Sequence, residues 1–339
     1  MGCASSSRPS AAITAVSVNR TVTERVARPS ILVTYKLPAA VIATLETVGD
    51  VEVHKDGLLP HDELVRRVTG KEALVPAGLD TVDRPVIEAG STLRIIANVA
   101  VGFNNIDVPY ARSKNIVVTN TPDVLTEATA NMAIALILAT TRRLGEAERL
   151  LRRGEWQGFR FDFMIGSDIR DRQLGVIGIG RIGRAVAEKA SALGMKIAYY
   201  DAAAVDAPDY ERMSLDRLLS TSDVVSLHVP LLPETKHLIN RTSLSRMKRS
   251  AYLINTSRGT VVDEEALLWA LGEGIIKGAG LDVYENEPQV HPGLLRLENI
   301  VLLPHMASAT DGTRFAMADL AARNVVNVLR GAPPVTPVP

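Results

Sequence analysis

The sequence is short of cysteine, of excess charge and of long apolar runs. Cys3 is the single cysteine among 339 residues, which excludes an intrachain disulfide framework and a thiolate cage for zinc. A reducing, cytoplasmic location is therefore expected. The 38 basic residues balance the 38 acidic residues, so no global attraction to nucleic acid or anionic lipid is expected. The apolar run at 132–139 is shorter than the roughly 20 residues that cross a bilayer.

Histidine is also sparse, and no spacing of histidines and acids predicts a metal centre. What is present is a chain with 46% hydrophobic residues, long enough for two domains at about 150 residues each. A small-molecule partner fits this composition better than a polymer or a membrane.

From Ile31 onward, short β-branched runs alternate with helical patterns, which predicts parallel sheets covered by helices. The spacing predicts one long helix from about Leu125 to Arg153 and another from Asp311 to Arg330, the latter returning to the first lobe. The predicted strands are at 31–35, 73–76, 94–100 and 116–120 in the first lobe, and at 173–180, 196–201, 224–229, 251–256, 278–283 and 300–305 in the second.

The chain ends differ from this pattern. Residues 1–30 lack the apolar core of a secretory signal and are expected to be a disordered extension. The start matches the pattern for myristoylation at Gly2, with Cys3 able to take a second acyl chain, although a spectator extension is the favoured interpretation. Residues 333–339 are rich in proline and are expected to form an extended tail.

A glycine motif in the second lobe predicts a dinucleotide site. Gly178, Gly180 and Gly183 follow an apolar strand and open a helix, where they allow a tight turn, close approach of a pyrophosphate and helix packing. Asp201 lies 18 residues after Gly183, close to the usual position of the carboxylate that binds the adenosine ribose. Its charge would repel a 2′-phosphate, so NADH is favoured over NADPH. The alternative for Asp201 is a turn-capping residue.

Three ionisable residues follow predicted strands of the second lobe, at the edge where such sheets bind ligands. Alone, Arg258 could be a surface arginine, Glu287 a solvated acid and His305 a structural histidine. Together they suit carbonyl reduction, because the arginine can hold a carboxylate and polarise the keto oxygen while the histidine exchanges a proton. A carboxylate bonded to the imidazole favours its charged form and orients the ring.

The motifs around these residues resemble the D-isomer-specific 2-hydroxyacid dehydrogenase family. The resemblance extends from about Ile31 to Pro334, through VAVGFNNIDV (99–108), VTNTPDVLTEATA (118–130), LGVIGIGRIG (174–183), INTSRGTVVDEEAL (254–267), AGLDVYENEP (279–288) and LLPHMASAT (302–310). Residues 31–123 and 306–332 would then form a flavodoxin-like substrate domain. Residues 124–305 would form an NAD-binding Rossmann domain, with the active site in the cleft between the two.

The resemblance also implies roles for individual residues. Arg258 would bind the substrate carboxylate and carbonyl, Glu287 would pair with His305, and His305 would be the proton donor. The backbone at Val101 and Gly102 would hold the substrate carboxylate. The implied cofactor-binding residues are Thr126, Gly178, Gly180, Arg181, Ile182, Gly183, Asp201, Val229, Pro230, Thr235, Thr256 and Asp282. A homodimer is expected, with the helix after Thr126 in its interface.

Within the family, the chain resembles glyoxylate and hydroxypyruvate reductases, because it lacks a C-terminal regulatory domain and contains RRGEWQGF at 152–159. An NADH-dependent reductase of a small 2-oxo acid is the leading hypothesis. The alternatives are a phosphoglycerate- or phosphite-type dehydrogenase and a non-enzymatic, NAD-sensing protein similar to a corepressor. The sequence leaves open the physiological 2-hydroxy acid and the reaction direction.

Overall fold

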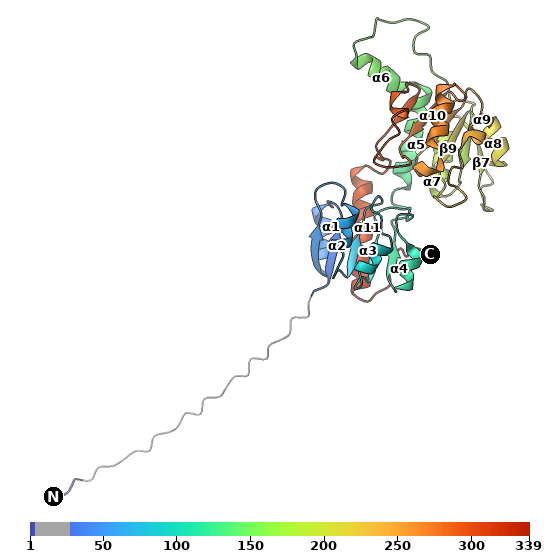
Figure 1. Cartoon of the computed structure of the whole chain (residues 1–339). Coiled ribbons are helices and arrows are strands. Elements are labelled where there is room, and N and C mark those ends of the chain that lie inside the picture. Colours follow the sequence, from blue (N-terminus) through green and yellow to red (C-terminus); the bar gives the residue numbers. More distant parts are fainter. Residues whose placement is uncertain (4–27) are drawn as a thin grey trace.

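The computed structural model describes residues 1–3 and 28–339. The expected disordered extension at 1–30 therefore lies mostly outside the described residues. Figure 1 shows two lobes, each built on a sheet with helices on both faces. In the described part of the chain, no helix combines the length and the apolar character that a membrane span requires.

The first sheet has five parallel strands in the order β2-β1-β3-β4-β5, the flavodoxin-like arrangement expected for this lobe. The sequence analysis missed β2, whose DVEV segment carries two acids and lies half exposed at the sheet edge. The strands are β1 (Ser30–Val33), β2 (Asp50–Val53), β3 (Ala73–Val75), β4 (Ile95–Ala97) and β5 (Val117–Thr119).

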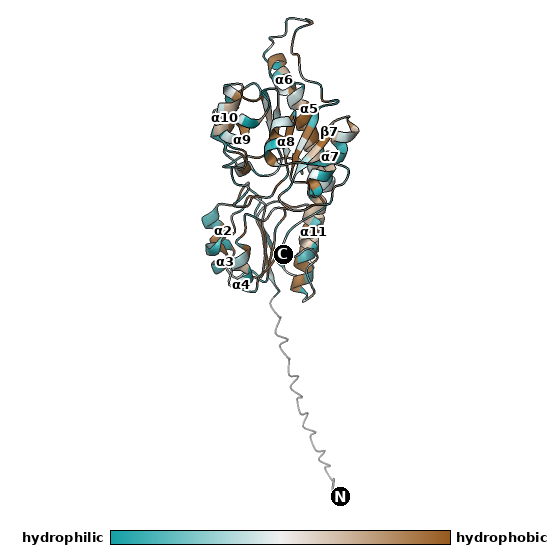
Figure 2. Cartoon of the chain, turned by 90° about the vertical axis from the view of Figure 1, so that its right-hand side faces the viewer, coloured by the Kyte–Doolittle hydropathy of each residue, from teal (hydrophilic) through white to brown (hydrophobic). Residues whose placement is uncertain are grey.

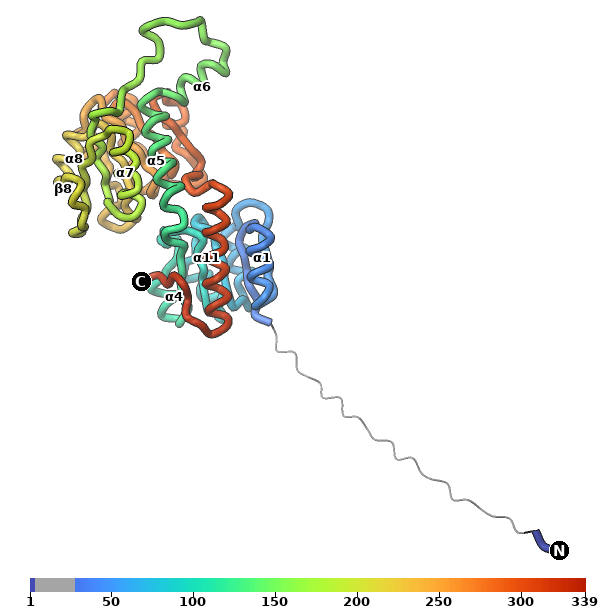
Figure 3. The backbone as a smooth tube through the Cα atoms, turned by 180° about the vertical axis from the view of Figure 1, so that it is seen from behind, coloured from blue at the N-terminus to red at the C-terminus, as the bar shows by residue number. Residues whose placement is uncertain are grey.

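Helices cover both faces of this sheet. The small residues Ala318 and Ala321 of α11 pack beside α1 against one face, while α2, α3 and α4 cover the other. The last helix, α11, packs beside the first helix, α1. The prediction that the last helix returns to the first lobe is therefore confirmed (Figure 3). These helices are α1 (Ala39–Glu46), α2 (His61–Arg67), α3 (Arg84–Ala89), α4 (Val108–Ser113) and α11 (Asp311–Leu329).

The C-terminal residues are extended and pair with the first sheet. The Val338 amide donates to the Val118 carbonyl at 2.9 Å, and Pro337 forms an antiparallel bridge with Thr119. The tail therefore covers the edge of β5, which would otherwise present unpaired backbone groups.

The second sheet has seven parallel strands in the order β12-β11-β10-β9-β6-β7-β8. Its central part matches the strand order of dinucleotide-binding folds. In these folds the strand order changes direction beside the first strand, which here is β6. The strands are β6 (Gln173–Ile177), β7 (Lys196–Tyr200), β8 (Glu211–Arg212), β9 (Val224–Leu227), β10 (Tyr252–Asn255), β11 (Gly278–Leu281) and β12 (Ile300–Leu302). The sequence analysis missed the two-residue β8.

On this sheet, α5 and α7 pack against one face, and α8, α9 and α10 against the other. The helices are α5 (Thr126–Thr141), α6 (Leu144–Arg152), α7 (Arg181–Ala192), α8 (Leu215–Thr221), α9 (Arg241–Arg246) and α10 (Glu264–Gly272). Short 3-10 turns occur at η1 (Gly259–Val261) and η2 (Leu294–Arg296).

The single helix predicted from Leu125 to Arg153 is wrong, because the segment divides into α5 and α6. Arg143 adopts a left-handed backbone conformation with φ 55°. The Thr141 carbonyl accepts the Ser167 amide at 2.8 Å instead of continuing the helical ladder. A contact with a distant segment therefore ends α5, and helical spacing alone does not reveal it. Figure 2 shows α6 and the following loop extending away from the lobe.

Candidate active site

His305 and Glu287 form a hydrogen-bonded pair at the carboxyl edge of the second sheet. Glu287 follows β11, His305 follows β12, and His305 Nδ1 lies 2.6 Å from Glu287 Oε2. The other oxygen, Oε1, accepts the Tyr284 amide at 2.9 Å. The Glu287 side chain is 12% exposed and the His305 side chain 40%. Since Nδ1 is engaged, Nε2 is the nitrogen available for proton exchange.

The backbone after His305 is held by a buried carboxylate. Asp282 accepts the Met306 amide on Oδ1 and the Ala307 amide on Oδ2, both at 2.8 Å. Burial raises the pKa of Asp282, and the two amide bonds oppose that effect. The geometry indicates that Asp282 orients the His305 turn, and its contact with a nicotinamide stays a prediction.

Arg258 reaches across to the first lobe. Its Nε donates to Asn104 Oδ1 at 2.9 Å, and Nη1 donates to the Ser257 carbonyl at 2.7 Å. An ideal Cβ on Gly102 would lie 1.8 Å from Nη2, so the guanidinium occupies space beside that glycine. Burial lowers the pKa of Arg258 while the nearby Glu287 raises it, and the group stays charged. Sequence reasoning missed Asn104, although it lies inside one of the family motifs.

The loop at Val101 and Gly102 presents backbone donors beside this guanidinium. The Val101 carbonyl accepts Asn120 Nδ2 at 2.7 Å, and the Gly102 carbonyl accepts Asn98 Nδ2 at 2.9 Å. Within residues 28–339, neither the Val101 nor the Gly102 amide has a hydrogen-bond acceptor. Two amides and a guanidinium together can hold a carboxylate.

The glycine turn after β6 has the form that a pyrophosphate requires. Gly178 has φ 91° and a Cβ there would lie 2.9 Å from the His228 carbonyl carbon, while a Cβ on Gly183 would lie 2.0 Å from the Gly178 oxygen. At Gly180, by contrast, a Cβ would project into open space. Gly180 is also the N-cap of α7 and provides no side-chain cap, so the first helical amides are available to an anion.

Asp201 lies at the end of β7, beside this turn. Its Oδ2 accepts the Ile179 amide and its Oδ1 accepts the Ala203 amide, both at 3.0 Å. The three residues that follow Asp201 are uncharged alanines, but the fold brings Arg212 there from β8. Arg212 Nη2 donates to the Asp201 carbonyl at 3.0 Å and to the Ala203 carbonyl at 2.9 Å. The ribose end of the site therefore contains a guanidinium as well as a carboxylate.

Two further expected cofactor residues are engaged in local structure. Arg181 forms an exposed ion pair with Asp123, with 2.8 Å between Nε and Oδ1. Thr235 donates its hydroxyl to the Pro230 carbonyl at 2.6 Å, which closes the loop after β9. In this conformation Arg181 faces Asp123, and its contact with a phosphate stays a prediction.

The remaining expected cofactor residues surround the turn or begin nearby elements. Val229 contacts Gly178, Ile182 packs against the core, and Thr126 is the first residue of α5. The buried Thr256 hydroxyl, at the end of β10, has no hydrogen-bond partner among the described residues. An unpaired buried hydroxyl is costly, and a bound nicotinamide dinucleotide could satisfy it. The residues present thus fit this cofactor.

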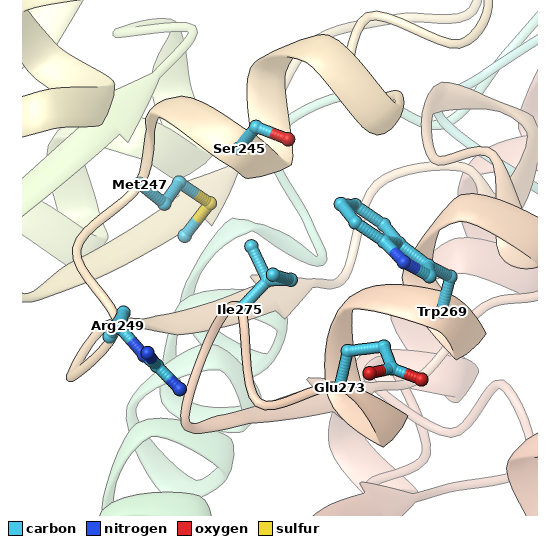
Figure 4. Close-up of a pocket in the computed structure, with 6 residues that line it drawn as sticks. All are labelled: Ser245, Met247, Arg249, Trp269, Glu273 and Ile275. Carbon is cyan, nitrogen blue, oxygen red and sulfur yellow. The ribbon is translucent and has the colours of Figure 1, made fainter.

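Other features do not coincide with this site. A cavity of about 430 Å³ between α9 and α10 is lined by none of the expected site residues (Figure 4). Its lining residues are Ser245, Met247, Arg249, Trp269, Glu273 and Ile275. Within residues 1–3 and 28–339, no three His, Cys, Asp or Glu side chains are grouped to hold a metal ion.

Comparison with known proteins identifies the family. The sequence model described as D-isomer specific 2-hydroxyacid dehydrogenase, NAD binding domain, matches residues 134–307. A glyoxylate reductase from Thermofilum pendens is 45% identical over 318 residues, covering 91% of this chain and 94% of that protein. The chain belongs to the D-isomer-specific 2-hydroxyacid dehydrogenase family. This 2-hydroxyacid dehydrogenase is an oxidoreductase that acts on CH–OH donors, and its Rossmann lobe binds a nicotinamide cofactor.

Solved structures agree with the family assignment. The TT0316 protein from Thermus thermophilus superimposes with a TM-score of 0.87 at 44% identity, covering 91% of this dehydrogenase and all of that chain. An NADPH-dependent glyoxylate/hydroxypyruvate reductase from Sinorhizobium meliloti, in complex with NADP and malonate, gives a TM-score of 0.83 at 36% identity. That comparison covers 92% of this dehydrogenase and 97% of the other chain.

Proposed function

We propose that this dehydrogenase reduces a small 2-oxo acid, with glyoxylate or hydroxypyruvate preferred, and uses NADH in preference to NADPH. The observation that carries the proposal is the placement of Arg258 against Gly102, close to the His305–Glu287 pair. It supports the assignment of residues 31–123 and 306–332 as the substrate domain and of 124–305 as the cofactor domain. A catalytic arginine from one domain then meets the carboxylate-binding loop of the other.

In the proposed reaction, the substrate carboxylate accepts hydrogen bonds from the Val101 and Gly102 amides. Arg258 holds the same carboxylate and polarises the adjacent keto oxygen. A bound nicotinamide dinucleotide supplies the hydride to C2 of the 2-oxo acid. His305 Nε2 donates the proton to the keto oxygen, which becomes the hydroxyl, and the Glu287 carboxylate stabilises the imidazolium before transfer.

The choice of substrate draws on the relatives. The Thermofilum relative is named a glyoxylate reductase, and the Sinorhizobium enzyme is a glyoxylate/hydroxypyruvate reductase. Both names support a two- or three-carbon 2-oxo acid. A phosphoglycerate-type substrate is the second candidate and is less favoured, because the exposed Leu79 lies in the same lobe as the carboxylate-binding loop and provides no charge for a phosphate.

The cofactor preference rests on two opposing groups. The Asp201 carboxylate disfavours a 2′-phosphate, whereas the Arg212 guanidinium would attract it. We propose that Asp201 dominates because it is fixed by two backbone amides beside the glycine turn. The Sinorhizobium relative is NADPH-dependent, so the preference of this dehydrogenase for NADH over NADPH has to be measured directly.

We also propose a homodimer, with α5, α6 and the loop at 153–168 in the interface. The loop exposes Trp156, Phe159 and Phe161, the last two at 87% and 92%. Figures 1 and 3 show this segment projecting from the cofactor lobe. Exposed aromatic groups of this kind mark interaction surfaces. Light scattering would report twice the chain mass, and a monomer at micromolar concentration would contradict the proposal.

The experiment that tests the function is a substrate screen with purified protein. Absorbance loss of NADH and NADPH is followed with glyoxylate, hydroxypyruvate, pyruvate and 3-phosphohydroxypyruvate. The proposal predicts the highest kcat/KM for glyoxylate or hydroxypyruvate with NADH. Binding of NADH without turnover of any 2-oxo acid would favour the NAD-sensing alternative, and turnover confined to the phosphorylated acid would favour the second candidate.

A further inference from the structure

A second histidine–carboxylate pair uses the same loop as the His305–Glu287 pair. His237 Nε2 is 2.5 Å from Glu285 Oε1, and Glu285 precedes Glu287 by two residues in the loop after β11. The His237 and Glu285 side chains are 36% and 24% exposed, so the contact is half buried. Neither residue belongs to the glycine turn, to the substrate loop or to the reacting groups.

His237 is joined to the loop of Arg258 through its backbone. Its amide donates to the Thr260 carbonyl at 2.9 Å, two residues beyond Arg258. Its carbonyl accepts Asn240 Nδ2 at 3.0 Å, and its φ is 49°. A left-handed backbone is uncommon outside glycine, and asparagine, aspartate and histidine are the residues that adopt it most readily. His237 is therefore held in one orientation, facing Glu285.

Glu285 is fixed from its other side by α10. The Glu285 amide donates to Oε1 of the buried Glu264 at 2.8 Å. Burial raises the pKa of Glu264, and the hydrogen bond from the Glu285 amide opposes that effect. The two loops also touch directly, because a Cβ on Gly259 would lie 1.8 Å from the Tyr284 carbonyl carbon. No side chain larger than hydrogen fits between them at this point.

These contacts converge on Glu287. The Tyr284 amide donates to Glu287 Oε1, and the Tyr284 hydroxyl donates to the Leu303 carbonyl, two residues before His305. A shift of the 284–287 segment would therefore move the Glu287 carboxylate away from the imidazole. Misplacement by about 1 Å can cost roughly 100-fold in rate, even when its cause is remote from the reacting atoms.

We propose that His237 and Glu285 form a positioning clamp, which holds the Glu287 loop against the Arg258 loop and so keeps the proton donor aligned. The clamp residues are positioning residues, because they act through Glu287 and Arg258 and contact neither substrate nor cofactor. The inference rests on the proposed function for its kinetic consequence. Its structural consequence, the order of residues 282–288, is independent of which substrate is used.

The test uses the full-length chain with His237→Ala, Glu285→Ala, the double variant and His237→Gln. Glutamine places its amide nitrogen near the position of the imidazole Nε2 and can donate it to Glu285, so it restores the contact. The alanine variants are expected to lower kcat about 10-fold while NADH affinity, from fluorescence titration, stays within 2-fold. The kcat of the double variant should fall no further than that of either single variant, since each single variant already removes the same contact.

Hydrogen–deuterium exchange is the second measurement. Exchange of residues 282–288 should increase in His237→Ala and return to the wild-type level in His237→Gln, with kcat following the same order. His61→Ala is the matched control, because His61 and Asp83 form an exposed pair at 2.9 Å in the other lobe. That variant should change neither quantity.

The outcomes separate the two proposals. Wild-type protein without 2-oxo acid reductase activity would overturn the proposed function, and the exchange data would still decide the clamp. An active wild type with unchanged kcat and exchange in His237→Ala would overturn the clamp. Equal losses in His237→Gln and His237→Ala would also overturn it, because the restored hydrogen bond would then have no effect.

Discussion

The Arg258 guanidinium occupies the volume that a side chain on Gly102 would need. The two residues come from different lobes, and an ideal Cβ on Gly102 would lie 1.8 Å from Nη2 and 2.7 Å from Cζ of Arg258. The absence of a side chain at position 102 therefore allows the arginine to reach the carboxylate-binding loop. This contact connects the proposed substrate-binding groups across the two lobes.

Gly102→Ala tests this relationship. The new methyl group must displace the end of a flexible side chain, so we expect the protein to fold and to melt near the wild-type temperature. The KM for the 2-oxo acid should rise about 10-fold or more, because a displaced bidentate contact loses roughly 1.5 to 3 kcal/mol. Gly312→Ala is the control, since a Cβ at Gly312 meets nothing within 4 Å. An unchanged KM would exclude the proposed carboxylate site.

His305→Gln tests the proton donor. Loss of a general acid typically costs about 10²–10⁴ in rate, so kcat should fall within that range. Glu287→Gln should give a smaller loss in kcat, because it removes the charge that stabilises the imidazolium but leaves an oxygen that can accept the Tyr284 amide. NADH affinity from fluorescence titration should stay unchanged in both. Retained turnover in His305→Gln would reject the assignment.

Asp201→Asn and Arg212→Ala test the cofactor preference. Asparagine removes the charge yet can still accept one of the two backbone amides, so the turn should persist. The ratio of kcat/KM for NADPH to that for NADH should rise about 10-fold in Asp201→Asn, equivalent to about 1.4 kcal/mol. In Arg212→Ala the ratio should fall. A wild-type enzyme that already prefers NADPH would contradict our assignment of Asp201.

His228 predicts a pH dependence of stability. Burial lowers the pKa of His228 to about 4, so the folded protein binds fewer protons than the unfolded chain between about pH 6.5 and 4. Stability must therefore fall as the pH is lowered through that window. The loss across this window is at most on the order of 3 kcal/mol, because the pKa of His228 falls from 6.5 to about 4 on folding.

Urea unfolding at several pH values measures this effect. In His228→Gln the free energy of unfolding should vary less between pH 7 and pH 4.5 than in wild type, because the titrating imidazole is gone. His61→Gln is the control, since His61 is 44% exposed in its side chain. If the free energy of unfolding depends on pH equally in wild type and in His228→Gln, His228 is not the source of the pH dependence.

The local patterns in the sequence were sufficient for much of the fold. The β-branched runs predicted the buried strands, and the three glycines predicted the turn at Gly178, because backbone constraints at these positions act within a few residues. The edge strand β2 was missed, since DVEV is polar and half exposed. The break at Arg143 was missed because the Thr141 carbonyl is bonded to Ser167, which is 26 positions away in sequence.

For the site, the sequence by itself determined which chemical groups are available. They are the guanidinium of Arg258, the carboxylate of Glu287, the imidazole of His305, and the carboxylate of Asp201 beside the glycine turn. These follow from residue type and from position at strand ends. Only the tertiary structure decided that Arg258 meets Gly102, that Arg212 joins Asp201, and that His237 faces Glu285. The reason is that hydrogen bonds and charge interactions depend on distances of a few ångströms, and chain folding sets those distances between residues that no local pattern relates.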